Sequence, residues 1–151
     1  MSSTLLTSTK VVIDAGVAVW AILPVMAGVD ILNKIVEWRK AGIDLYVPSL
    51  WLAETTSTIR RVVSTNLISS NKGLIALEDL FALDITVVST TPAHCRSALV
   101  WAERLGQSKA YDGFYLALAD ELEASLYTTD QRMVNGAQQK GISWVKWIGH
   151  E

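Results

Sequence analysis

The sequence predicts an α/β fold with a mostly parallel five-stranded sheet that carries helices on both faces. Short β-branched runs alternate along the chain with longer segments of helical apolar spacing, and this order is typical of parallel strands joined by crossover helices. The run KVVID at residues 10–14 suits a strand buried on both faces. Residues 111–123 are apolar nearly all round, which predicts a central, buried helix.

The first half of the chain contains two expected strands and four expected helices. Residues 10–14 form the first strand, and residues 15–23 form a short apolar helix that Pro24 stops, because a proline ring cannot continue a helix. Residues 30–40 have helical spacing, and Gly42 closes that helix. The remaining elements are a strand at 44–47, a helix from Ser49 as N-cap to about Asn66, and a helix from Ser69 or Ser70 through Leu80.

The second half of the chain supplies the other three strands. Residues 84–88 form a strand, and the pair Thr91-Pro92 then starts a helix, because Thr is a good N-cap and Pro fits the first helical position. Gly106 ends this helix. The remaining elements are the helix at 111–123, a strand at 125–129, a short helix capped by Asp130 and ending near Gly136, and a strand at 142–145.

Composition bounds the size and the partners of the protein. We expect one domain spanning residues 1–151, a length that suits a full core. Half of the residues are hydrophobic and 19% are charged, below the usual share of about 25%. This balance predicts a large core and apolar surface for association, in a homodimer or a higher homo-oligomer. The net charge of −2 does not mark the whole chain as a nucleic-acid binder, although a local basic strip remains compatible with it.

Cysteine content and hydropathy point to a cytoplasmic protein without a membrane segment. Cys95 is the only cysteine, so the chain has no internal disulfide, and one thiol cannot build a zinc site. The longest uncharged run, at residues 15–29, is too short to span a membrane. Residues 1–10 lack the apolar core of a signal peptide.

Four acidic residues lie beside large apolar residues, unlike most of the other acids. Asp14 follows VVI at a strand end, Glu54 follows LWLA inside a helix, Asp112 lies between Tyr and GFY at a helix start, and Asp130 follows LYTT at a strand end. Taken singly, each has an ordinary explanation in a turn, a helix dipole or an N-cap. Together they are expected at the carboxyl edge of the parallel sheet, where ligands bind.

Four carboxylates at one edge repel one another and hold protons more tightly, and a divalent cation offsets that repulsion. A ligand set made only of oxygen, without His or Cys, selects Mg²⁺ or Mn²⁺ over Zn²⁺. The sequence therefore predicts a magnesium or manganese site.

Four segments of the sequence resemble the PIN-domain family, the fold of the VapC-type toxin ribonucleases. They stand in the family's order and cover the chain from about residue 10 to residue 145. The segments are VVIDAGVAV at 11–19, VPSLWLAETTSTI at 47–59, AYDGFYLALAD at 110–120 and LYTTDQRM at 126–133.

The resemblance implies a Mg²⁺- or Mn²⁺-dependent endoribonuclease that leaves a 5′-phosphate and a 3′-hydroxyl. It implies that Asp14 and Asp112 are the main metal ligands and that Glu54 acts through a bound water or as a proton acceptor. Asp130 would complete the site or hold a second, weaker ion, and Thr128 would supply a hydroxyl beside it. The expected partners are RNA and, for the toxin of a toxin–antitoxin pair, an antitoxin protein.

Lys109 and Arg132 are the cations expected to bind the RNA substrate, since they precede Asp112 and follow Asp130 closely. One position departs from the family pattern: Gly16 stands where a Ser or Thr is common. The missing hydroxyl leaves open an alternative function, a catalytically weak or inactive PIN-like module that binds RNA or metal. A haloacid-dehalogenase-type phosphatase is disfavoured because it needs an Asp at position 16, and neither GxGxxG nor a P-loop occurs.

Overall fold

A parallel five-stranded sheet lies between two layers of helices, as the sequence predicts. The structure is a computed structural model that describes residues 9–23 and 30–149. The expected stop at Pro24 lies outside these residues. The elements, in chain order, are β1 (Lys10–Ile13), α1 (Ala15–Ile22), α2 (Ile31–Lys40), β2 (Asp44–Pro48), α3 (Leu50–Ser64), α4 (Ser70–Phe81), β3 (Thr86–Val88), α5 (Pro92–Arg104), α6 (Tyr111–Leu122), β4 (Ser125–Thr128), α7 (Gln131–Gln139) and β5 (Val145–Trp147).

The strands lie in the order β3-β2-β1-β4-β5, and every neighbouring pair is parallel. In the central strand, Val12 is opposite Tyr46 of β2 and Leu126 of β4. The chain builds outward from β1 to β2 and β3, then returns to the other side of β1 for β4 and β5. The topological switch point, where ligands bind in sheets of this kind, therefore lies between the carboxyl ends of β1 and β4.

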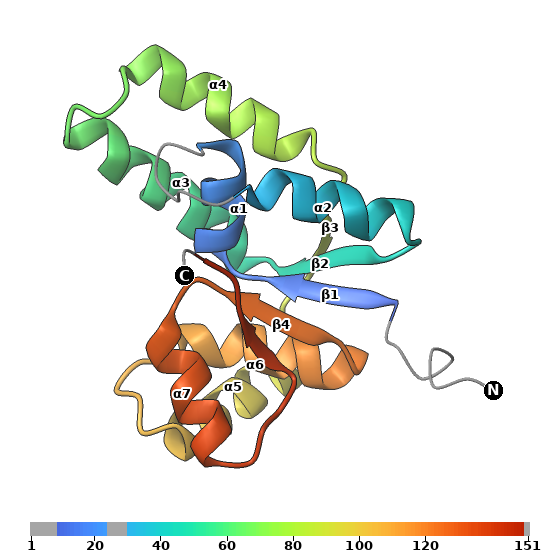
Figure 1. The fold of residues 1–151 in the computed structure, drawn as a ribbon. Helices are drawn as coiled ribbons and strands as arrows, with labels where there is room; N and C mark the ends of the chain where they lie inside the picture. The colour runs from blue at the N-terminus through green and yellow to red at the C-terminus, as the bar shows by residue number, and fades with distance from the viewer. Residues whose placement is uncertain (1–8, 24–29, 150–151) are drawn as a thin grey trace.

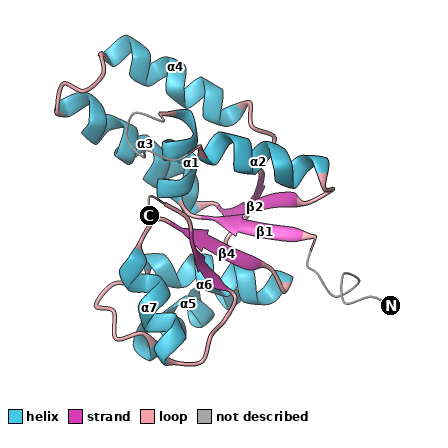
Figure 2. Cartoon of the chain, in the orientation of Figure 1, coloured by secondary structure: helices cyan, strands magenta, loops and turns pink. Residues whose placement is uncertain are grey.

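Helices α1–α4 cover one face of the sheet and α5–α7 cover the other (Figure 1 and Figure 2). Right-handed crossovers explain this division, because a reversal in the direction of strand addition moves the connecting helices to the opposite face. Helix α6 packs against β1, β2 and β4, and its residues 115–119 are all buried. The prediction of a central, buried helix at residues 111–123 is thus confirmed.

The start of α5 is a capping box that also ties α5 to α6. The Thr91 hydroxyl accepts a hydrogen bond from the His94 backbone N–H at 3.2 Å, and His94 Nδ1 accepts one from the Thr91 backbone N–H at 3.1 Å. His94 Nε2 lies 2.9 Å from a carboxylate oxygen of Glu121 on α6. With Nδ1 as acceptor, the neutral imidazole donates from Nε2. The expected start at Thr91-Pro92 is confirmed.

Ser49 occupies the expected N-cap position of α3, but its side chain does not cap the helix. Ser49 already has helical backbone angles, φ −59° and ψ −28°, and its side chain makes no capping hydrogen bond. An N-cap side chain reaches the first turn from an extended backbone, which Ser49 does not adopt. Its hydroxyl instead lies 2.7 Å from the hydroxyl of Thr90, just before α5.

The last two elements differ from their expected bounds. Helix α7 continues past Gly136 to Gln139, because a glycine inside a helix weakens it without ending it. The last strand is β5, not residues 142–145, because pairing with β4 begins only where Val145 lies opposite Leu126. Ile142 is buried before the strand begins, so its apolar character reports burial and not strand position.

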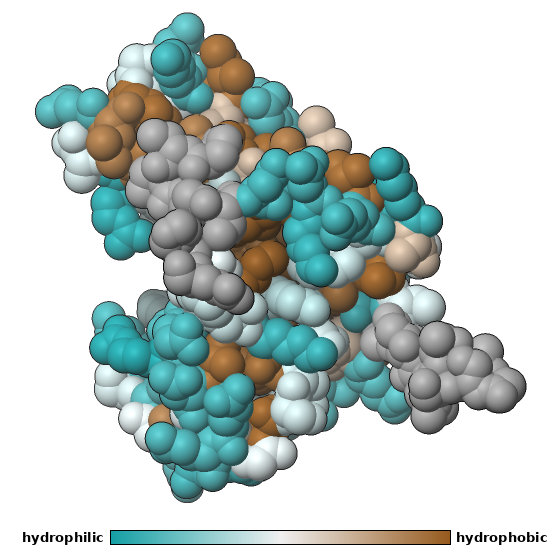
Figure 3. Space-filling model, viewed as in Figure 1, coloured by the Kyte–Doolittle hydropathy of each residue, from teal (hydrophilic) through white to brown (hydrophobic). Residues whose placement is uncertain are grey.

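The low share of charged residues in the sequence corresponds to exposed apolar side chains on the surface. Leu74 and Ile75 on α4 and Leu99 and Val100 on α5 are exposed, and Figure 3 shows hydrophobic surface gathered over α3 and α4. Within residues 9–23 and 30–149, no helix is both long and apolar enough to cross a membrane.

Candidate functional site

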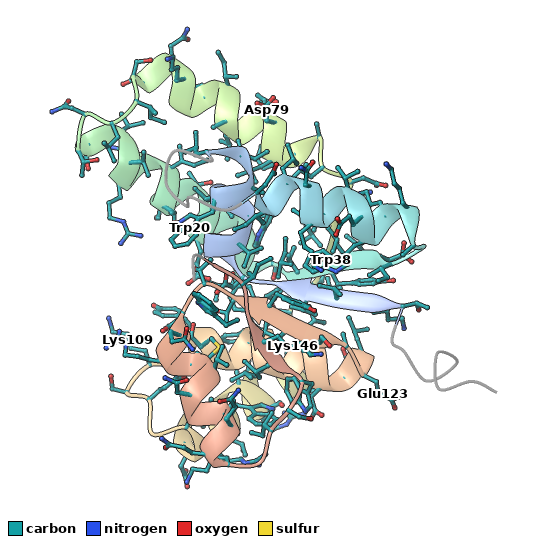
Figure 4. All side chains as sticks on the ribbon, in the orientation of Figure 1. Trp20, Trp38, Asp79, Lys109, Glu123 and Lys146 are labelled. Atoms are coloured by element: carbon teal, nitrogen blue, oxygen red, sulfur yellow. The ribbon has the colours of Figure 1, made fainter. Side chains whose placement is uncertain are left out.

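A cleft of about 570 Å³ opens beside the carboxyl ends of the strands. Glu54, Asp112 and Asp130 line it together with two cations, Lys109 and Arg132. In Figure 1, β1 runs toward the left of the view, so the carboxyl ends of the parallel strands face that side. Figure 4 shows Lys109 on the same side and Glu123 on the opposite side. Three of the four acids predicted from the sequence, and both predicted RNA-binding cations, thus meet at one cleft.

Asp14, the fourth acid, lies at the end of β1 and caps α1. Its Oδ1 accepts a hydrogen bond from the Val17 backbone N–H at 2.9 Å, as an N-cap does. Its Oδ2 accepts one from the Thr128 hydroxyl at 2.5 Å. The Thr128 oxygen in turn accepts the backbone N–H of Asp130 at 3.0 Å. The fully buried Thr128 therefore fixes the two strand-end acids relative to each other across the switch point.

The environment of Asp14 raises the pKa of its carboxyl to about 6. Burial is the largest cause, because removal from water disfavours the charged form. The charges of Asp112 and Glu54 raise the pKa further, whereas the hydrogen bonds from Thr128 and Val17 oppose the rise. Asp14 is therefore close enough to both of these cleft acids to respond to their charge.

Glu54 is held by a buried tyrosine on the opposite helix layer. The Tyr115 hydroxyl on α6 donates a hydrogen bond to Glu54 Oε1 on α3 at 2.6 Å. Burial and the charge of Asp112 raise the pKa of Glu54, while the Tyr115 hydrogen bond lowers it. Burial and the adjacent Glu54 raise the pKa of Tyr115 itself, so its hydroxyl remains a donor at neutral pH.

Tyr115 is a site residue that the sequence pattern did not single out, since it lies among the apolar residues of a buried helix. A signal was present: residues three apart on a helix share a face, so Tyr115 follows Asp112 toward the sheet edge.

Asp112 begins α6 and accepts a hydrogen bond from the Gln107 side-chain amide at 3.1 Å. Burial and the charge of Asp130 raise the pKa of Asp112, and the amide lowers it. Among the described residues, the carbonyl oxygen of Gln107 is one of two buried side-chain polar atoms that lack a hydrogen-bond partner. The other is the indole nitrogen of Trp51. Sequence reasoning also missed Gln107, since it belongs to a polar loop without a motif.

Asp130 caps α7, as expected, by accepting the Arg132 backbone N–H at 3.0 Å. The Arg132 side chain is almost fully exposed, with its Nε 4.0 Å from Asp130 Oδ1. Lys109 is also exposed. Both cations are therefore free to contact a ligand at the rim of the cleft while the acids stay inside.

The donor set fits a hard divalent cation, although no cage is preformed. In the part of the chain that the structure describes, no three Asp, Glu, His or Cys side chains are grouped closely enough to hold an ion together. Mg²⁺ commonly retains several waters and uses one or two carboxylates. The raised pKa values of Asp14, Glu54 and Asp112 and the unpaired Gln107 oxygen are what a site adapted to added positive charge would have without the ion.

Comparison with known proteins gives a family match and two similar structures. The PIN domain family model matches residues 11–138. The crystal structure of PAE2754 from Pyrobaculum aerophilum has a TM-score of 0.64 and 16% identity, covering 84% of this chain and 78% of that chain. VapBC2 from Rickettsia felis, bound to a DNA fragment from their promoter, has a TM-score of 0.62 and 14% identity, covering 94% and 99%. No curated protein matches the sequence.

Proposed function

Because the chain belongs to the PIN domain family, we propose that it is a nuclease and, more specifically, a Mg²⁺- or Mn²⁺-dependent endoribonuclease. The observation that carries the proposal is the electrostatic state of the sheet edge. Burial and two neighbouring carboxylates raise the pKa of Asp14 to about 6, beside a cleft whose rim carries Lys109 and Arg132. The excess negative charge inside the cleft suits a bound cation. The cations at its rim suit an anionic substrate.

Asp14 and Asp112 are the proposed ligands of the metal, with Asp130 completing the site. When bound, the metal would lower the pKa of a water and offset the charge that develops on the phosphoryl oxygens. Thr128 orients the carboxylate of Asp14 through its hydrogen bond. Tyr115 holds Glu54 in place, so that Glu54 can accept a proton from the attacking water.

Lys109 and Arg132 are the proposed contacts to RNA. Both line the cleft and are exposed to solvent, so they can contact phosphate groups of a bound strand, and contacts to phosphates give affinity without base preference. These cations also attract the strand toward a cleft whose carboxylates alone would repel it.

We also propose that the protein acts as the toxin of a toxin–antitoxin pair and forms a homodimer. The fold is shared with VapBC2 of Rickettsia felis, which is bound to a DNA fragment from their promoter in its crystal structure. The exposed Leu74, Ile75, Leu99 and Val100 supply apolar surface of the kind that an antitoxin or a second copy would cover.

A PIN-like module that binds RNA or metal with little or no catalysis is the second candidate. The observation that favours it is the lack, among the described residues, of a preformed group of three ligands. Metal affinity and cleavage then have to be measured separately.

The proposed nuclease is tested by cleavage of single-stranded and structured RNA in Mn²⁺. We expect the wild-type protein to cleave and Asp112→Asn to reduce the rate at least about 100-fold, because it removes a charge that the bound ion requires. The matched control is Asp79→Asn, an exposed acid of α4 that Figure 4 shows far from Lys109, and it should cleave normally. Equal rates for wild type and Asp112→Asn would contradict the assignment, and Mn²⁺ binding without cleavage would favour the module.

Tyr115→Phe is expected to weaken Mn²⁺ binding about tenfold, because Glu54, which would act on the ion through a bound water, loses the group that orients it. The substitution leaves Glu54 without the hydrogen bond that lowers its pKa, so Glu54 binds a proton more readily. Isothermal titration calorimetry at pH 7 measures the affinity. Tyr46→Phe on β2 is the control and should bind as the wild type does. An unchanged affinity for Tyr115→Phe would show that the Glu54 contact does not serve the site.

A further inference from the structure

Gly16 and Thr129 lie against each other beside Asp14. Gly16 lies in the first turn of α1, and Thr129 lies in the bend that follows β4. A Cβ atom added to Gly16 would lie 2.3 Å from the Thr129 hydroxyl oxygen and 3.4 Å from Asp14 Oδ1. The first distance is far shorter than any van der Waals contact, so the Thr129 hydroxyl occupies the space where a side chain at position 16 would begin.

Two consecutive threonines therefore lie near Asp14, one in contact with it and the other across the space beside Gly16. The buried Thr128 donates to Oδ2, while the partly exposed Thr129 has its hydroxyl over Gly16, on the Oδ1 side. The two hydroxyls differ in how firmly they are held. Thr128 is engaged by both Asp14 and the Asp130 backbone N–H, whereas Thr129 reaches solvent.

We propose that Thr129 is a positioning residue of the acidic site, whose hydroxyl serves in place of a polar side chain at position 16. Its hydroxyl orients water beside Asp14, and position 16 is glycine because this hydroxyl needs the space. This inference rests on the proposed function, since it assigns the water to the hydration of the proposed metal. It also removes the reason for reading Gly16 as a lost catalytic feature, because the hydroxyl is supplied from the end of β4.

The two side chains compete for the same space. Threonine is branched at Cβ and has few χ1 rotamers, so its hydroxyl leaves this space only by a change of rotamer. A side chain at position 16 must therefore turn the Thr129 hydroxyl away or displace the start of α1. Removing the Thr129 side chain should make room for a serine at position 16, which then places a hydroxyl in the same space.

The test combines four variants with two measurements, the Tm of the metal-free protein and the Kd for Mn²⁺ from titration calorimetry. Thr129→Val keeps the shape without the hydroxyl, and we expect a nearly unchanged Tm with a Kd raised about fivefold or more. Thr129→Ser should bind as the wild type does. Gly16→Ser should lower the Tm by about 4 °C or more. The double variant Gly16→Ser/Thr129→Ala should recover both the Tm and the Mn²⁺ affinity.

Controls separate this inference from the function on which it rests. Gly136→Ser on α7, where an added Cβ meets nothing within 4 Å, should not lower the Tm. If Asp14→Asn abolishes Mn²⁺ binding and Thr129→Val binds like wild type, the Thr129 inference is overturned and the proposed site stands. If Asp14→Asn leaves Mn²⁺ binding unchanged, both the Thr129 inference and the proposed metal site are contradicted. If the double variant is as unstable as Gly16→Ser, the shared space does not explain Gly16.

Discussion

Replacing Asp14 with asparagine is expected to abolish Mn²⁺-dependent cleavage and to stabilise the metal-free protein at neutral pH. Asparagine caps helices as well as aspartate does, so the contact with the Val17 N–H can persist. The buried negative charge disappears, and with it the repulsion from Glu54 and Asp112. A residue that improves function at the expense of stability is expected at an active site.

The direction of the pH dependence follows from the pKa of Asp14, which is 3.8 ordinarily and about 6 in the folded protein. Between these values the folded state binds more protons than the unfolded state. The free energy of unfolding therefore falls as pH rises from about 4 to 6, and it stays at the lower value above that. A shift of about two units corresponds to at most about 3 kcal/mol, and the partial exposure of Asp14 reduces our expectation to about 1–2 kcal/mol.

Urea unfolding in EDTA at pH 5 and pH 7.5 measures this effect. Wild type should lose more stability between pH 5 and pH 7.5 than Asp14→Asn, by about 0.5–1 kcal/mol, because part of the loss already occurs below pH 5, while Asp79→Asn should behave as the wild type does. In the same pH range, Mn²⁺ affinity of the wild type should fall as pH drops below 6, because protons compete with the ion for Asp14. An identical pH response in wild type and Asp14→Asn would contradict the buried charge at this position.

The fold and the placement of the acids at the sheet edge could be predicted from the sequence, because both depend on local residue patterns and on the order of the elements. KVVID marks β1 as a buried strand, and in a parallel sheet the residue after such a strand lies at the ligand-binding edge. The bounds of α7 and β5 were wrong because Gly136 looks like a helix end and Ile142 looks like a strand residue. Neither local signal reports the pairing of β5 with β4, which sets the actual register.

Two contacts of the site could not be predicted, because each joins distant parts of the chain. Tyr115 and Glu54 are 61 residues apart, and their contact requires α3 and α6 to approach the same sheet edge from opposite layers. Thr129 and Gly16 meet only because β4 returns to lie beside β1. Such contacts follow from topology and side-chain geometry together, which a single sequence does not reveal.

Gly113→Ala is expected to destabilise the protein by about 3 kcal/mol, the upper part of the usual range for overpacking. An added Cβ would lie 2.3 Å from the carbonyl oxygen of Ala98 on α5 and 3.0 Å from the Ala98 Cα. These are backbone atoms of a helix and cannot rotate away, so α5 and the first turn of α6 must move apart. Alanine's better helix propensity returns at most about 1 kcal/mol. Urea unfolding at neutral pH measures the difference.

Substitutions at two other glycines test whether the destabilisation comes from the contact with Ala98. Gly136→Ala on α7, where an added Cβ has no neighbour within 4 Å, should gain about 0.5–1 kcal/mol from helix propensity. At Gly73 on α4, the nearest atom is a methyl carbon of Val63, 2.8 Å from the added Cβ, and a side chain can adjust more easily than a backbone. The expected order of stability is therefore Gly136→Ala, then Gly73→Ala, then Gly113→Ala, and any other order would contradict the packing argument.

The position of Gly113 gives its substitution a second consequence. It follows Asp112 in the first turn of α6, so a movement of this turn that relieves the clash with α5 also moves a proposed metal ligand. Mn²⁺ titration of folded Gly113→Ala, under conditions where unfolding is negligible, should show weaker binding than in Gly73→Ala or Gly136→Ala. Normal affinity in a destabilised Gly113→Ala protein would mean that α6 keeps its place at the sheet edge and that α5 moves instead. The two measurements together thus decide which part moves. Because α6 contacts β1, β2 and β4, we expect the body of α6 to stay in place and its first turn, which carries Asp112, to tilt away from α5.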